Sequence, residues 1–184
     1  MKILIYTDGS SRGNPGPGGW SAIIMSDEDV VELGGREDLT TNNRMELLGA
    51  IHGLKEVDGR WSIANSDTDT NQPSAISHEL LTVEVHTDSQ YVKKGMSEWI
   101  DGWIRKNWIG STKKPVLNQD LWKELKKEED RLKAIGVKVE WKYVQAHVGI
   151  TMNERADTIA TMCADDASDL RLYRGSRKDY FFKV

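Results

Sequence analysis

The chain has little cysteine and no long apolar stretch. Its 184 residues include one cysteine, Cys163, which excludes an internal disulfide and a cysteine-based zinc site. No run of about 18 apolar residues occurs, so no membrane-spanning helix is expected. The chain does not open with a basic segment followed by an apolar one, which argues against secretion. With 38% hydrophobic and 29% charged residues, these absences predict a globular protein of the cytoplasm.

An overall excess of basic charge is also missing, since the formal net charge is −4. The charge is unevenly distributed, however. Residues 93–114 hold six basic residues and two acids, a local charge of +4, which leaves −8 for the rest of the chain. The same segment contains Trp99, Trp103 and Trp108. A basic, aromatic-rich patch on an acidic protein is typical of a polyanion-binding surface. The alternative is a solvated helical face with its tryptophans in the core.

The predicted secondary structure alternates between strands and helices. Strands are expected over residues 2–7, 20–26, 30–36, 81–86 and 137–144, and helices over residues 43–57, 89–95, 97–106, 119–134 and 153–167. Glycine and proline residues at 12–19 predict a turn between the first two strands. This order predicts an α/β fold in which a mixed sheet, antiparallel at its start, carries helices on its faces.

No internal repeat or linker divides the chain, so residues 1–168 are expected to form a single domain. Within it, residues 58–78 are polar and lack any period, which predicts a surface-loop insertion. Asp67 and Asp69 lie there, but the other ligand positions of a calcium loop are missing. Residues 169–184 form a tail with basic and aromatic residues. The tail either packs on the domain or extends a nucleic-acid surface.

Acidic residues stand at the ends of several predicted elements. Asp8 and Asp88 each follow a strand, Glu46 belongs to the first turns of a helix, and Asp157 lies near the start of the last helix. Acids at the carboxyl ends of strands point into the crevice where open α/β sheets bind ligands. Four carboxylates on separate elements can converge into a cage for a hard divalent cation. Glu32, among strand residues, is by contrast expected to be exposed.

Several short motifs surround these acids in a distinctive order and spacing. They are Tyr6–Ser10 with Gly13–Gly19, Thr40–Leu47, Thr87–Val92, Trp99–Trp108, Lys113–Val116 and Asp120–Trp122. In these motifs the chain resembles type 1 ribonuclease H, of the bacterial kind that carries a basic protrusion, here residues 93–114. The resemblance covers residues 3–167. It implies a mixed five-stranded sheet, three antiparallel strands followed by two parallel ones, with helices on both faces.

The resemblance also implies a function. It predicts an endoribonuclease that hydrolyses the RNA strand of RNA–DNA hybrids by two-metal-ion catalysis, as in R-loop and replication-primer removal. The products carry 5′-phosphate and 3′-hydroxyl ends. Two Mg²⁺ ions are the expected cofactor, with Mn²⁺ as a substitute. The partner is the hybrid and not a membrane, and the chain is expected to act as a monomer.

Individual residues match functional positions of the family. Asp8, Glu46, Asp88 and Asp157 match its metal-binding acids, and His147 matches its mobile-loop histidine, although a loop histidine without this context is more often a surface residue. The implied substrate-binding residues are Asn14, Asn43 and Gln90 for the minor groove, Thr41 and Arg44 for a DNA phosphate, and Lys93, Lys94, Trp99, Trp103, Lys113 and Lys114 for the DNA strand.

Three other functions are compatible with the same fold. The chain could bind hybrids without cutting them, but all four acids are present. It could be a different nuclease or a strand-transfer enzyme with the same acid cage, but the amide residues and the basic protrusion serve hybrid recognition. It could be an adaptor whose basic protrusion contacts protein. Salt-sensitive binding to hybrid in preference to duplex DNA would separate these functions.

Overall fold

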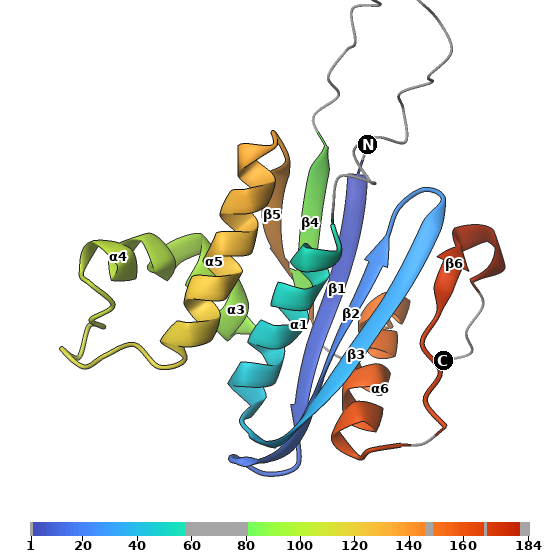
Figure 1. The fold of residues 1–184 in the computed structure, drawn as a ribbon, viewed down its shortest axis with the longest axis horizontal. Helices are drawn as coiled ribbons and strands as arrows, with labels where there is room; N and C mark the ends of the chain where they lie inside the picture. The colour runs from blue at the N-terminus through green and yellow to red at the C-terminus, as the bar shows by residue number, and fades with distance from the viewer. Residues whose placement is uncertain (1, 58–80, 146–148, 168, 181–184) are drawn as a thin grey trace, which may run out of the picture.

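The computed structural model describes residues 2–57, 81–145, 149–167 and 169–180. Its strands form one sheet in the order β5-β4-β1-β2-β3-β6 (Figure 1). The strands are β1 Lys2–Ser11, β2 Gly16–Met25, β3 Asp29–Thr40, β4 Thr82–Thr87, β5 Lys138–Tyr143 and β6 Arg174–Ser176. β1, β2 and β3 are antiparallel, whereas β4 and β5 run parallel to β1. The predicted mixed sheet is confirmed, and β6, antiparallel to β3, adds a sixth strand.

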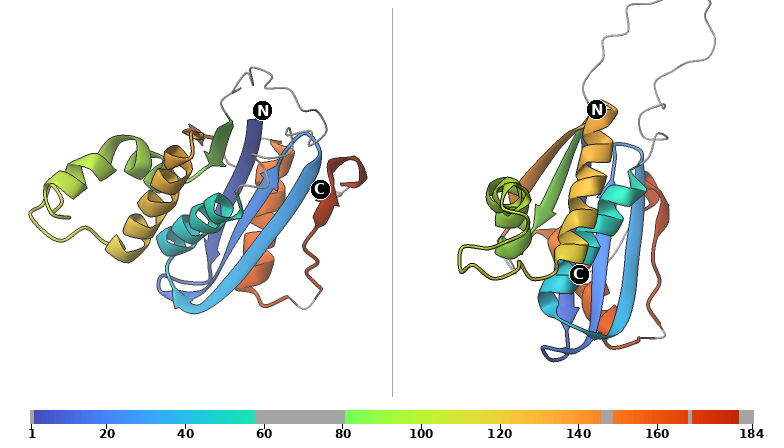
Figure 2. Two further views of the ribbon diagram at one scale, coloured as in Figure 1. Left: turned by 45° about the horizontal axis from the view of Figure 1, so that its top comes forward. Right: turned by 60° about the vertical axis from the view of Figure 1, so that its left-hand side comes forward.

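Helices cover both faces of this sheet, as predicted. They are α1 Asn42–Glu56, α3 Gln90–Lys94, α4 Ile100–Arg105, α5 Gln119–Ala134 and α6 Thr151–Ala164. α1 and α5 pack side by side on one face, and α6 lies on the other face across β1 and β2 (Figures 1 and 2). A π-helical turn over Gly95–Trp99 joins α3 to α4. In the described ranges, no helix combines the length and apolar character that crossing a bilayer requires.

The alternation of side chains along the strands builds the core. The fully buried aliphatic residues on the face of α1 and α5 include Ile3 and Ile5 of β1, Val83 and Val85 of β4, and Leu47, Ile51 and Leu54 of α1. A smaller cluster between the sheet and α6 includes Ile23 and Ile159. Burial of each such side chain contributes roughly 1.5–3 kcal/mol. This packing fixes the strand register on which the site depends.

The glycine-rich segment is less of a turn than predicted. Residues 12–15 make the turn, whereas Gly16 to Gly19 already belong to β2. A Cβ on Gly19 would lie 2.2 Å from the carbonyl oxygen of Ala160 on α6. Glycine therefore allows helix and strand backbones to pack in direct contact here. A run of glycines predicts a turn by composition, but at this position it serves close packing.

The prediction that Glu32 is exposed was wrong. Its side chain is fully buried, and the guanidinium of Arg155 on α6 donates two hydrogen bonds to it, at 2.7 and 2.8 Å. The Tyr180 hydroxyl and the Tyr173 backbone N–H donate two more. Burial by itself would raise the pKa of Glu32, but these four donated bonds outweigh it and lower the pKa.

The C-terminal tail packs on the domain, as the first of the two predicted alternatives expects. β6 pairs with the start of β3, and the Glu32 backbone N–H donates to the Tyr173 carbonyl. Arg155 donates to the Arg171 carbonyl as well as to Glu32. The tail is thus held by the sheet and by α6 at once. The predicted surface insertion, residues 58–78, lies outside the described residues.

Candidate active site

Two acids lie at the same level on neighbouring parallel strands. Register pairs Thr7 of β1 with Thr87 of β4, so Asp8 and Asp88 follow at equivalent positions. Asp8 is 6% exposed, and its carboxylate accepts a 2.7 Å hydrogen bond from the Gly9 backbone N–H. The predicted placement at a strand end therefore holds for Asp88, which follows β4, but was wrong for Asp8, because β1 continues to Ser11 through its pairing with β2.

A third acid, Glu46, approaches from the second turn of α1. It is 5% exposed, and one carboxylate oxygen accepts a 3.3 Å hydrogen bond from Asn42. Gly9 permits this approach, because a Cβ there would lie 2.3 Å from the Glu46 backbone nitrogen. Among the described residues, no group donates to the other carboxylate oxygen, Oε2, which is buried.

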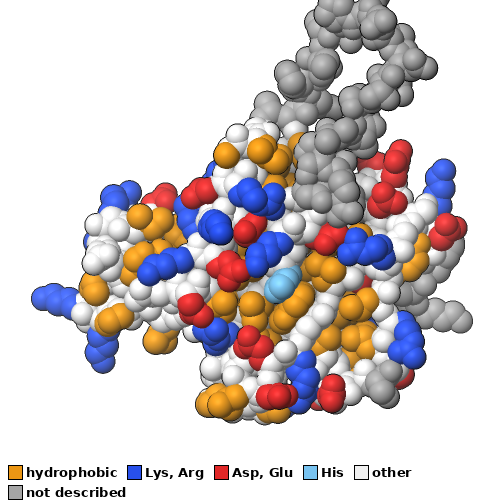
Figure 3. Space-filling view, viewed as in Figure 1, with side chains coloured by type: hydrophobic (Ala, Val, Ile, Leu, Met, Phe, Trp, Pro, Cys, Tyr) orange, Lys and Arg blue, Asp and Glu red, His pale blue; other side chains and the backbone are white. Residues whose placement is uncertain are grey.

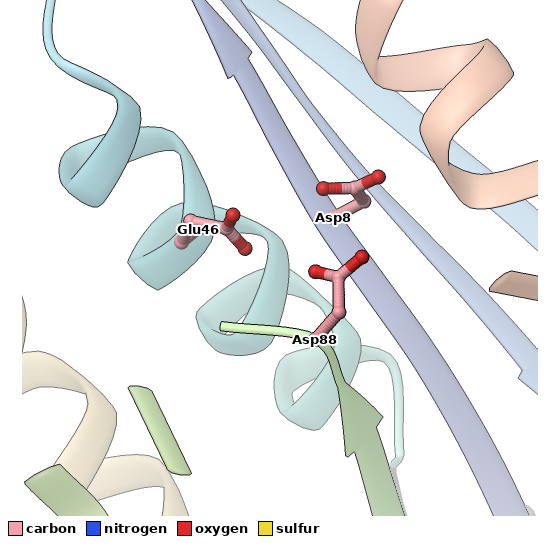
Figure 4. A group of neighbouring side chains, drawn as sticks. All are labelled: Asp8, Glu46 and Asp88. Atoms are coloured by element: carbon pink, nitrogen blue, oxygen red, sulfur yellow. The ribbon is translucent and has the colours of Figure 1, made fainter. Parts of the chain in front are cut away.

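The three carboxylates point toward one another (Figure 4). One oxygen from each of Asp8, Glu46 and Asp88 lies within 4.8 Å of the others. Asp157, half-buried on α6, is near enough for its carboxyl group to raise the pKa of Asp8. The structure therefore brings together the four acids that the sequence singled out, from β1, α1, the end of β4, and α6.

The electrostatics of this cluster favour a bound cation. Burial, followed by the charges of Asp88 and Asp157, raises the pKa of Asp8 from 3.8 to about 8. Burial and the charges of Asp8 and Asp88 also raise the pKa of Glu46. Acids packed this closely cannot all ionise without a positive charge among them. Clustered carboxylate oxygens, with one buried and unpartnered at Glu46, fit a divalent metal ion.

Comparison with known proteins assigns this chain to a family. A model of the RNase H family matches residues 1–165. The chain belongs to the RNase H family. A ribonuclease H of Phenylobacterium zucineum (strain HLK1) is 43% identical over 175 residues, which are 95% of this chain and 98% of that protein. The resemblance inferred from the motifs is confirmed.

Solved structures agree with the assignment to the RNase H family. LC9-RNase H1, a type 1 RNase H with the type 2 active-site motif, is 26% identical, with a TM-score of 0.66 over 90% of this chain and 72% of that chain. LC11-RNase H1, solved in complex with an RNA/DNA hybrid, is 24% identical, with a TM-score of 0.55 over 90% of this chain and 98% of that chain. At this identity, the likeness to LC11-RNase H1 shows that the two chains share a fold. RNase H family enzymes depend on divalent metal, in agreement with the acid cluster.

One polar residue of this RNase H site escaped the sequence reasoning. Asn153 on α6 is 2% exposed, and its amide Nδ2 donates a 3.2 Å hydrogen bond to Oδ2 of Asp88. It lies four residues before Asp157, so both side chains occupy one helix face. The available signal was this spacing, together with the rarity of a polar residue on the buried face of a helix.

The predicted minor-groove residues lie on segments that adjoin the acids. Asn14 is in the turn between β1 and β2, Asn43 is in the first turn of α1, and Gln90 begins α3 two residues after Asp88. All three amide side chains are exposed. Thr41 directly precedes α1. The predicted loop histidine, His147, lies outside the described residues.

Arg44, predicted to bind a DNA phosphate, already has an acidic partner. Its guanidinium donates two hydrogen bonds to Asp120 of α5, at 3.1 and 2.9 Å. The side chains of Arg44 and Asp120 are 29% and 61% exposed. Solvent therefore reaches the pair, and a phosphate binding there would compete with a single exposed carboxylate.

The basic protrusion stands apart from the sheet. α4 and the loop that follows it extend beyond α5 at the left of Figure 1, and lysine and arginine side chains surround that end in Figure 3. Lys94, Lys113 and Lys114 are exposed, while Lys93 contacts Glu98 at 3.5 Å. These lysines are presented to solvent, as a polyanion-binding surface requires.

Tryptophan rings anchor this protrusion to the domain. The ring of Trp103 lies between Trp99 and the buried Trp122 of α5, with centroid distances of 5.7 and 5.3 Å. Trp99 remains 36% exposed. Trp103 therefore packs against the core, as the second alternative expects, while Trp99 faces solvent.

Proposed function

We propose that this chain is an endoribonuclease that hydrolyses the RNA strand of RNA–DNA hybrids and leaves 5′-phosphate and 3′-hydroxyl ends. The observation that carries the proposal is the convergence of Asp8, Glu46 and Asp88 from three separate elements. Membership of the RNase H family identifies the reaction as cleavage of RNA paired with DNA. LC11-RNase H1, which shares the fold, binds an RNA/DNA hybrid. Removal of R-loops and replication primers is the cellular role that this activity fits.

The four carboxylates Asp8, Glu46, Asp88 and Asp157 are the proposed metal ligands. Mg²⁺ is the favoured ion, with Mn²⁺ as a substitute, because carboxylate oxygens suit hard cations. When bound, a pair of such ions activates the attacking water and neutralises charge on the leaving 3′ oxygen. The acids must ionise to bind, so Asp8 and Glu46 release protons as the site is loaded.

The remaining residues are proposed to hold the substrate and move protons. Asn14, Asn43 and Gln90 offer amide donors and acceptors for the 2′-hydroxyl, which distinguishes RNA from DNA in the minor groove. Thr41 and Arg44 hold a phosphate of the DNA strand.

His147 exchanges protons between the site and solvent, since a neutral imidazole can do so near pH 7. The basic protrusion binds the DNA strand through Lys93, Lys94, Trp99, Trp103, Lys113 and Lys114. We assign catalysis to residues 1–168, with 58–78 as a surface insertion away from the acids. The enzyme acts as a monomer in the cytoplasm, where hybrids form as DNA is transcribed and copied.

Cleavage of a labelled RNA–DNA hybrid in Mg²⁺ tests this function, with double-stranded RNA and duplex DNA as controls. Wild-type protein should cut only the hybrid, and Asp8→Asn should abolish cutting. Asp38→Asn is a matched control, because that carboxylate is 92% exposed on β3, and it should retain full activity. Tight hybrid binding without cutting would indicate a binding module. Activity that survives Asp8→Asn would refute the acid assignment.

A further inference from the structure

Asn153 joins two elements that each contribute an acid to the site. It projects from the first turn of α6, and its donor reaches Asp88 at the end of β4, 65 residues away in sequence. Its side chain is almost fully buried, so the contact is shielded from solvent. One bond therefore links the helix that carries Asp157 to Asp88, the residue that directly follows β4.

The chemistry of an amide suits this contact. A carboxylate only accepts hydrogen bonds, so the amide must present its N–H to Asp88. Lysine or arginine in this place would neutralise the acids and compete with a cation, and a carboxylate would repel them. The neutral N–H engages one oxygen of Asp88, Oδ2, and leaves the other without this donor.

The carbonyl oxygen of the Asn153 amide indicates that a ligand binds here. Among the described residues, the Asn153 carbonyl oxygen, Oδ1, is buried and has no hydrogen-bond partner. Such a buried acceptor is unfavourable unless a partner is supplied when the site is loaded. A water molecule on a divalent ion is a strong donor, and Mg²⁺ keeps several waters when it binds to proteins.

We infer that Asn153 is a positioning residue for the metal site: its N–H fixes the Asp88 carboxylate, and its Oδ1 accepts a hydrogen bond from a water on the bound ion. The inference rests on the proposed metal site. Asn153 acts through Asp88 and through that water, and it does not touch the substrate. Its contribution is to fix the orientation of the Asp88 carboxylate so that the acid cluster can bind an ion.

Calorimetric titration of the whole chain with Mg²⁺ or Mn²⁺ tests the inference directly. Asn153→Ala should weaken ion binding by about 10–100-fold, the range found for partners of metal ligands. Thr158→Ala is the control on the same helix, because the exposed Thr158 hydroxyl donates to the Glu154 backbone carbonyl within α6. It should leave ion affinity unchanged. Equal losses in both variants, or no loss in Asn153→Ala, would overturn the inference.

Kinetics on the hybrid separate positioning from substrate contact. At saturating Mg²⁺, Asn153→Ala should lower kcat and leave KM for the hybrid unchanged, because a residue that is 2% exposed cannot contact a duplex. A raised KM with unchanged kcat would instead place Asn153 in the substrate interface and refute the inference.

A double-mutant cycle tests the Asn153–Asp88 pair without metal or substrate. Urea unfolding in EDTA would compare Asn153→Ala, Asp88→Ala and the double variant. The two substitutions should have coupled effects on the free energy of unfolding, because the residues share a buried hydrogen bond. Additive effects would refute the positioning of Asp88 by Asn153. This result does not depend on cleavage. A wild-type chain that fails to bind ions would therefore refute the proposed function and the water contact, while the cycle would still decide whether Asn153 positions Asp88.

Discussion

At the scale of single residues, Asp8 shows how the fold opposes the ionisation of its own site. Burial and the neighbouring charges of Asp88 and Asp157 raise its pKa to about 8. The folded protein therefore keeps a proton on Asp8 between pH 3.8 and about 8, whereas the unfolded chain releases it. Stability without metal is greatest below this window and falls as pH rises through it. The site is thus prepared for a cation at a cost in stability.

The raised pKa of Asp8 predicts that stability falls as pH rises and that bound metal reverses this loss. In EDTA, the free energy of unfolding of the wild type should fall by roughly 4 kcal/mol between pH 5 and pH 8. Asp8→Asn cannot ionise at this position, so its stability should depend less on pH and should exceed that of the wild type at pH 8. Urea unfolding followed by circular dichroism measures both.

Two controls accompany this prediction. Asp38→Asn removes an exposed acid outside the cluster and should keep the wild-type pH dependence. Addition of divalent ion at pH 8 should stabilise the wild type and have less effect on Asp8→Asn. An equally steep decline in Asp8→Asn would show that Asp8 is not the group that binds the proton.

At the scale of elements, α6 is fixed from behind by the tail. Glu32 of β3 accepts hydrogen bonds from Arg155 of α6 and from Tyr173 and Tyr180 of the tail. Arg155 lies two residues before Asp157 on the same helix. The position of Asp157, a proposed metal ligand, is therefore tied to a buried ion pair on the opposite side of that helix.

Loss of Arg155 should destabilise the protein strongly. Arg155→Ala would leave a buried carboxylate without its cation and lower the free energy of unfolding by about 3 kcal/mol. The Glu32→Ala/Arg155→Ala double variant should be less destabilised than this, because no uncompensated charge remains. The control is Arg174→Ala, whose ion pair with Glu56 is 55% exposed at the arginine, and it should lower stability by about 1 kcal/mol or less. Equal losses for both arginines would contradict the prediction.

The same elements show what sequence can and cannot reveal. Asp8 and Asp88 were predictable because each follows a strand pattern, and Glu46 because helical spacing places it in the first turns of α1. The end of β1 was not predictable from that pattern, since the strand continues to Ser11. Glu32 was not predictable, since alternation along β3 cannot show that a segment about 140 residues later will cover it. Asn153 had no signal as strong as the acids, because its partner is defined only by the packing of α6 on the sheet.

At the scale of the whole molecule, the basic protrusion lies apart from the acid cluster. The acids converge from β1, α1 and the end of β4, while the exposed lysines lie on a protrusion that Trp103 holds against the domain. A duplex that spans both would present its RNA strand to the acids and its DNA strand to the lysines. This division explains how a protein with a net charge of −4 can bind a polyanion.

Binding of the hybrid should therefore depend on salt through the protrusion. In an Asp8→Asn background, which prevents cleavage, Lys113→Ala/Lys114→Ala should weaken hybrid binding. The slope of log K against log salt should become shallower by about 0.7–0.9 for each phosphate that the protein no longer neutralises. Fluorescence anisotropy at several salt concentrations measures this slope. Lys178→Ala, on the tail beside β6, should bind like the parent, and an unchanged slope in the lysine double variant would place the DNA strand elsewhere.

The short strand β6 also affects whether two molecules can associate through the edges of their sheets. An uncovered edge of a sheet offers unpaired backbone groups to any passing strand, which is a common start of aggregation. β6 occupies the first residues of the β3 edge, Asp29 to Val31, and Arg36 to Asp38 bring charge to the remainder. The opposite edge, β5, is lined by Lys138 and Lys142, both paired with Glu140. Two copies that approached edge to edge would have to desolvate charge before pairing backbones, so concentrated protein should stay dispersed and not grow into extended sheets.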